Sequence, residues 1–135
     1  MTKKEKINGW LQETNNINYI FRNVDLYLDN NYGGDIQYLY SLVDTEEKEL
    51  GGYYRPLQKK EITILKGYIC KSFIDVIKDG LNWDGIEASE STIKNTLKMY
   101  GWYTVLTTRF LNELNGEIEN IDILKEAFKK YYKGV

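Results

Sequence analysis

Histidine is absent from the 135 residues of this chain, and its absence excludes several kinds of catalytic site. Histidine has the side-chain pKa closest to neutral and is the commonest metal ligand in proteins. Without it the chain cannot build a Ser-His-Asp or Cys-His nucleophile, a mixed Cys/His zinc site or an HExxH metal site. The phosphate-binding patterns GxxxxGK[ST] and GxGxxG are absent too. We therefore expect a protein that is not an enzyme, with no metal and no cofactor.

Cysteine and proline occur once each, and long apolar runs are missing. A single cysteine, Cys70, cannot form an intramolecular disulfide, and its apolar neighbours predict a buried side chain. No segment approaches the ~18 consecutive apolar residues of a membrane span. The charged start, MTKKEKINGW, does not have the apolar stretch of a secretory signal. These features predict a cytoplasmic protein that does not enter the membrane.

Positive and negative charges nearly balance, with 18 basic and 20 acidic residues and a formal net charge of −2. Such a balance supplies little attraction to the phosphates of a nucleic acid. Hydrophobic residues make up 42% of the chain and aromatic residues 14%, which is enough for a packed core. A length of 135 residues fits one domain, and no linker divides it. We expect a single α-helical domain over residues 1–135.

Apolar residues recur at intervals of three and four residues between glycine-rich segments, and this spacing is typical of amphipathic helices. The glycines at 33–34 and 51–52 predict helix boundaries, and Gly80 is expected to end the longest helix. Alternation typical of strands is nearly absent. The predicted helices cover residues 3–13, 17–28, 36–43, 62–77, 89–114 with a bend at Gly101, and a short helix from Asp122. The fold class is therefore all-α, a single compact bundle of five or six helices.

Large aromatic side chains stand in or beside the predicted turns, where small polar residues are usual. The set consists of Tyr53, Tyr54, Trp83 and Trp102, with Arg55 next to the two tyrosines. One interpretation is that these side chains close the ends of the bundle and keep their polar tips in water. The other is that they form a protein-binding surface, because Tyr, Trp and Arg dominate interface hot spots. Both interpretations stay open at this point.

An acidic segment precedes the two tyrosines and contains Glu46, Glu47 and Glu49. It is either a solvated helix end or a patch that meets a basic partner. Combined with the loop aromatics, it favours a non-enzymatic protein-binding factor, such as a small regulator, inhibitor or anti-defence or immunity-type protein. Abundant Lys, Asn, Ile and Tyr, all with AT-rich codons, indicate a gene from a low-GC bacterium or its phage, and this composition is compatible with a phage or mobile-element origin. We also expect a homodimer, because two-fold dimers are the commonest assemblies.

Residues 73–100 support an alternative, a DNA-binding transcriptional regulator with a helix-turn-helix-like segment. The second helix of that motif would direct polar side chains into a major groove. The residues that would do so are Ser91, Thr92, Lys94 and Asn95. Against this alternative, the predicted join at residues 80–88 is longer than the three or four residues of the motif's turn. Binding to a protein partner is therefore favoured over binding to nucleic acid.

Overall fold

The computed structural model describes residues 1–49 and 59–114, and of residues 36–49 and 62 it describes the backbone alone. The described residues form five helices and no strand, which confirms the predicted all-α class. None of these helices is both long and apolar enough to cross a membrane. The helices are α1 (Lys3–Leu11), α2 (Thr14–Glu49), α3 (Lys59–Trp83), α4 (Glu90–Met99) and α5 (Trp102–Leu114).

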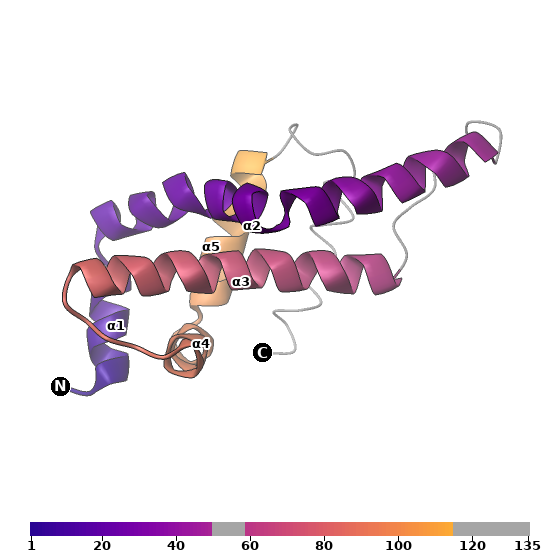
Figure 1. Cartoon of the computed structure of the whole chain (residues 1–135). Coiled ribbons are helices and arrows are strands. Elements are labelled where there is room, and N and C mark those ends of the chain that lie inside the picture. Colours follow the sequence, from indigo (N-terminus) through magenta and orange to yellow (C-terminus); the bar gives the residue numbers. More distant parts are fainter. Residues whose placement is uncertain (50–58, 115–135) are drawn as a thin grey trace.

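The two long helices, α2 and α3, lie side by side and form the frame of the bundle (Figure 1). Helix α1 crosses one end of this pair and also contacts α4. Helix α4 is seen end-on in the same view, so it runs across the direction of α3 before the chain turns into α5. Contacts of α4 with α1, α3 and α5 join the short helices to the frame.

Local signals explain where several helices begin and end. The hydroxyls of Thr2 and Ser89 each accept a hydrogen bond from a backbone N–H three residues ahead, at 3.2 Å, and so cap α1 and α4. Gly101 has φ +71°, a left-handed conformation that favours glycine, and it separates α4 from α5. The helix predicted from residue 89 therefore begins at Glu90, directly after its cap, and the predicted bend at Gly101 is a break between two helices.

Two predicted helix boundaries are wrong. Gly33 and Gly34 lie inside α2, so the segments predicted at 17–28 and 36–43 belong to one helix. The reason is tertiary packing, which overrides the roughly 1 kcal/mol that a helical glycine costs. Directly before these glycines, the rings of Tyr32 and Tyr68 stack at 4.5 Å and 13° and fasten α2 to α3. Gly80 likewise lies inside α3, which continues to Trp83. The predicted boundary at 51–52 and the predicted helix from Asp122 lie outside the described residues.

The core centres on Phe73 of α3, whose side chain is 2% exposed. Its ring meets the rings of Phe21 from α2 and Phe110 from α5 edge-on, with centroids 6.1 Å and 5.2 Å away. Edge-to-face pairs of this kind add to the stabilisation from burial alone. Cys70 is buried in the same helix, as its apolar neighbours predict. Phe73 thus connects three helices that are far apart in sequence.

Phe73→Ala is expected to lower the free energy of unfolding by about 3–5 kcal/mol, because it leaves a cavity between three helices. Leu26→Ala is the control, since Leu26 is 55% exposed and its truncation should change stability by less than about 0.5 kcal/mol. Chemical denaturation followed by circular dichroism measures both variants. Similar losses of stability in the two variants would contradict this account of the core.

Candidate functional site

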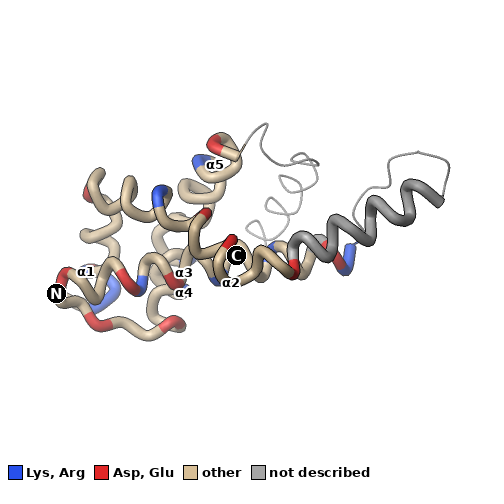
Figure 2. Tube along the Cα trace, turned by 45° about the horizontal axis from the view of Figure 1, so that its top comes forward, with Lys and Arg blue, Asp and Glu red and all other residues tan. Residues whose placement is uncertain are grey.

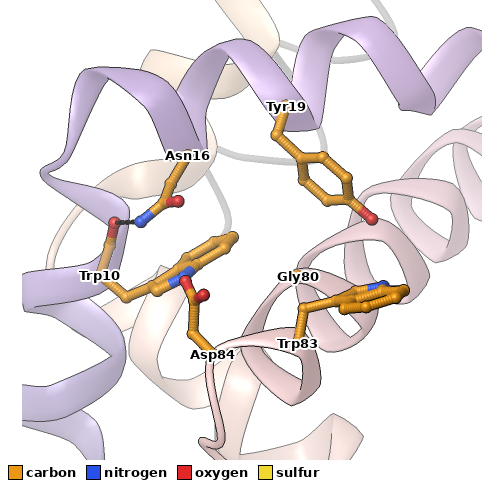
Figure 3. A pocket seen from close by; sticks show the side chains of 6 residues that line it. All are labelled: Trp10, Asn16, Tyr19, Gly80, Trp83 and Asp84. Carbon is orange, nitrogen blue, oxygen red and sulfur yellow. Dashed lines mark hydrogen bonds between the residues drawn. The ribbon is translucent and has the colours of Figure 1, made fainter.

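A surface pocket of about 250 Å³ lies where α1 turns into α2, against the end of α3. Figure 3 shows Trp10 and Asp84 on one side of this space, Tyr19 and Trp83 on the other, and Gly80 between them. Three aromatic rings and a carboxylate therefore surround one small opening. The lining residues, which we call the aromatic pocket, are Trp10, Asn16, Tyr19, Gly80, Trp83 and Asp84.

One wall of the pocket is fixed by a hydrogen bond between residues 74 positions apart. The indole Nε1–H of Trp10 donates to Asp84 Oδ2 at 2.6 Å, a charged acceptor that makes the bond stronger than one between neutral groups. The amide of Asn16 donates to the carbonyl oxygen of Trp10 at 2.8 Å and to Glu13 Oε2 at 3.0 Å. These bonds connect the end of α1, the start of α2 and the residue after α3.

The floor of the pocket requires glycine at position 80. A Cβ atom at this position would lie 2.6 Å and 2.7 Å from the Trp10 ring and 3.0 Å from the Tyr19 ring. Distances below 3.0 Å are too short for carbon atoms, so either the ring or the helix would have to move. Gly80 is therefore a packing residue that allows the indole to rest on the backbone of α3.

Tyr19 and Trp83 form the opposite wall and differ in exposure. Tyr19 is half-buried, and burial followed by the negative charge of Asp79 raises the pKa of its phenol above the ordinary value. The phenol is consequently neutral at physiological pH. Trp83 is 84% exposed and is the last residue of α3, not a loop residue as predicted. Its indole is the most exposed aromatic surface of the pocket.

Negative charge predominates around the pocket. Asp84 lines it, Glu13 accepts a hydrogen bond from the lining residue Asn16, and Asp79 acts on the lining residue Tyr19. Among the side chains that the structure describes, none forms an ion pair with Asp84, Glu13 or Asp79. No lysine or arginine lines the pocket, and Lys78 borders a separate hollow instead. These carboxylates favour a cation over an anion in the pocket.

Of the predicted partner-binding residues with described side chains, Trp83 lines this pocket and Trp102 does not. Trp102 is half-buried, and its indole Nε1–H donates to Asn8 Oδ1 at 2.7 Å, so it joins α5 to α1. The predicted acidic residues Glu46, Glu47 and Glu49 lie in the last turns of α2. That end of α2 is at the far side of the molecule from α1, about 40 Å along the helix from Tyr19 (Figure 1). The predicted contacts Tyr53, Tyr54 and Arg55 lie outside the described residues.

No motif in the sequence indicates Trp10, Tyr19 or Asp84 as site residues. Trp10 belongs to an apolar helical stripe and has the pattern of an ordinary core residue, with 6% exposure. The available signal was Leu81, an apolar residue that follows Gly80 and would place this glycine inside a helix, where it can have a packing role. The position of Gly80 after the apolar stripe instead predicts a helix end.

The outer face of α4 carries the residues of the DNA-binding alternative. Ser91, Lys94 and Asn95 are exposed, whereas Thr92 is half-buried with its hydroxyl 2.9 Å from that of Ser89. The join between α3 and α4 covers residues 84–89, which is shorter than predicted yet longer than the turn of a helix-turn-helix. Figure 2 shows acidic and basic residues interspersed over the described helices. Helix α4 therefore has a polar face, but no concentrated basic surface lies beside it in the described part of the chain.

An ion pair fastens the start of α4 to α3. Lys71 Nζ contacts Glu90 and also Asp75 Oδ1, the latter at 3.1 Å. The hydrogen bond from Lys71 lowers the pKa of the Glu90 carboxyl, and the same bond raises the pKa of Lys71. The basic charge of Lys71 is thus occupied by carboxylates, which leaves it less free to contact a phosphate.

Gly80→Ala is expected to destabilise the protein by about 1–3 kcal/mol, since the added methyl group collides with the Trp10 ring. Gly67→Ala is the matched control in the same helix, because a Cβ atom there would meet no described atom within 4 Å beyond the adjacent turns of the helix backbone. That control should stabilise the protein by about 0.5–1 kcal/mol through helix propensity. Urea unfolding monitored by tryptophan fluorescence compares the two variants. A stabilised Gly80→Ala variant would show that the indole does not rest on α3.

Comparisons of this chain with protein-family models, with curated proteins and with solved structures find no match.

Proposed function

We propose that this protein is a non-enzymatic binding factor that holds a partner protein through the aromatic pocket and the exposed Trp83 beside it. The observation that supports the proposal is the 84% exposure of Trp83 at the rim of a preformed hollow. A regulator, an inhibitor and an immunity-type factor encoded by a phage or mobile element all act in this way, by occupying a partner.

The physical argument concerns the apolar area of the indole. A tryptophan buries about 150–250 Å² when it is covered, and apolar burial contributes about 25 cal/mol per Å². The indole of Trp83 gains almost none of this burial free energy within the described fold. Binding of a partner that covers the indole therefore gains nearly all of it. Tryptophan is also among the residue types most enriched in interface hot spots.

The surroundings of Trp83 favour binding because they are already ordered. The hydrogen bond from Trp10 to Asp84 and the contact of Trp10 with Gly80 hold the rest of the pocket in place before a partner arrives. Little conformational entropy is then lost on association, and preorganised surfaces bind more tightly for the same area.

Trp83→Ala is expected to weaken binding by at least about 2 kcal/mol, the usual threshold of a hot spot, without changing the unfolding midpoint. The partner is first captured from host lysate with immobilised wild-type protein and identified by mass spectrometry. Titration calorimetry then compares wild type, Trp83→Ala and the control Leu26→Ala, whose side chain is exposed but does not line the pocket. Equal affinity of all three proteins would contradict the proposal.

The segment containing Tyr53, Tyr54 and Arg55 stays a prediction of the same kind. Tyr54→Ala or Arg55→Ala is expected to weaken partner binding by about 1–2 kcal/mol if this segment takes part in the interface. Its acidic neighbours Glu46, Glu47 and Glu49 would accelerate encounter with a basic partner and make the association rate depend on salt. Stopped-flow association at several salt concentrations measures that dependence.

Exposure of Ser91, Lys94 and Asn95 on α4 supports the second candidate, a DNA-binding regulator. If α4 binds DNA, affinity for random duplex DNA should fall steeply as salt rises, because cations are released from the phosphates. Lys94→Ala should then flatten that dependence, whereas Trp83→Ala should not. We expect the protein to show no such binding at physiological salt.

A further inference from the structure

We propose that the aromatic pocket receives the cationic end of a lysine or arginine side chain from the partner. This inference rests on the proposed function and assigns the chemistry of the group that enters the pocket. Its evidence is that three aromatic rings and the carboxylate of Asp84 surround one small opening (Figure 3).

The rings supply the first part of the recognition. Trp10, Tyr19 and Trp83 come from three helices and border the same space. The face of an aromatic ring is electron-rich, so it attracts a cation whose centre lies within about 6 Å, and tryptophan does so most strongly. A planar guanidinium can also stack on an indole. Ammonium and guanidinium groups therefore both suit these walls.

The carboxylates supply the second part. Asp84 is held at the mouth by the Trp10 indole, which donates to Oδ2. Among the described residues no other group donates to this carboxylate, so Oδ1 is open to a ligand. Glu13 and Asp79 add negative charge nearby. A cation entering the pocket gains a charge-assisted hydrogen bond to Asp84 at a position that is already fixed.

Other occupants fit less well. An anionic side chain would meet the negative field of Asp84, Glu13 and Asp79. An aliphatic side chain would cover the carboxylate of Asp84 without supplying a donor, and a buried polar group that loses its partners in water is costly. The volume of about 250 Å³ is below the ~300–1,000 Å³ of typical small-molecule sites and suits the end of one side chain.

Matched probes test the inference without the partner. The 15N-labelled protein is titrated with N-acetyl-argininamide and with N-acetyl-citrullinamide, which has nearly the same shape and no charge. A second pair is N-acetyl-lysinamide and N-acetyl-norleucinamide. The indole N–H signals of Trp10 and Trp83 should shift with the cationic probes, with at least about threefold tighter binding than for their neutral counterparts. The Trp102 indole, bonded to Asn8 away from the pocket, is the internal reference.

Replacing Asp84 with a neutral residue tests whether its carboxylate binds the cationic probes. Asp84→Asn keeps an oxygen that can accept from Trp10, and it should weaken the cationic probes about threefold or more while leaving the neutral probes unchanged. Glu87→Gln is the control, since Glu87 is exposed on the same turn but borders other hollows. The inference is overturned if citrulline binds as tightly as arginine, if Trp10 and Trp83 do not respond, or if both variants behave alike.

These outcomes are separate from those of the proposed function. Suppose that Trp83→Ala loses partner binding and that charged and neutral probes bind equally well. The proposed function would then stand, and the cationic ligand would be rejected. Suppose instead that the cationic probes bind selectively and that Trp83→Ala binds the partner fully. The cation site would then stand, and the protein interface at Trp83 would be rejected. The lysine and arginine pairs also show which of the two side chains the pocket prefers.

Discussion

The close approach of Trp10 to the backbone of α3 is the constraint on which the candidate site depends. The indole reaches this position only because residue 80 has no side chain. From there its N–H reaches Asp84, and the end of α1 is fastened to the end of α3. The same approach leaves Tyr19 and Trp83 on the other side of an open space. One missing methyl group thus determines both the packing of two helices and the shape of the pocket.

The rigid and exposed parts of the molecule have separate roles. Phe73 joins α2, α3 and α5 through ring contacts in the centre, and the pocket lies at the end of the frame that these contacts support. Trp83 extends from that frame into solvent while Trp10 beside it is buried. A binding surface built in this way presents one large apolar group on a support that needs little rearrangement.

Local sequence signals predict much of this fold and little of the site. Helical periodicity, the cap at Ser89 and the turn at Gly101 depend on neighbouring residues, so they are visible in the sequence. The continuation of α2 through Gly33 depends on the stacking of Tyr32 with Tyr68, 36 positions later in the chain, and no local pattern shows it. The pocket is harder still to predict, because Trp10 and Gly80 have ordinary sequence contexts and acquire their roles only when three helices meet.

Gly80 also has a consequence for the evolution of this chain. Every other standard amino acid carries a Cβ atom, so every mutation at this position meets the same collision with the Trp10 ring. Selection would preserve glycine there even though it offers no side chain to a partner. The rim residue Trp83 is under a different constraint, since its exposed side chain can change without disturbing the core, and under the proposed function it would change with the partner. In a lineage that switches partners, position 83 would diverge while position 80 stays glycine, so invariance would mark the scaffold and variation would mark the binding surface.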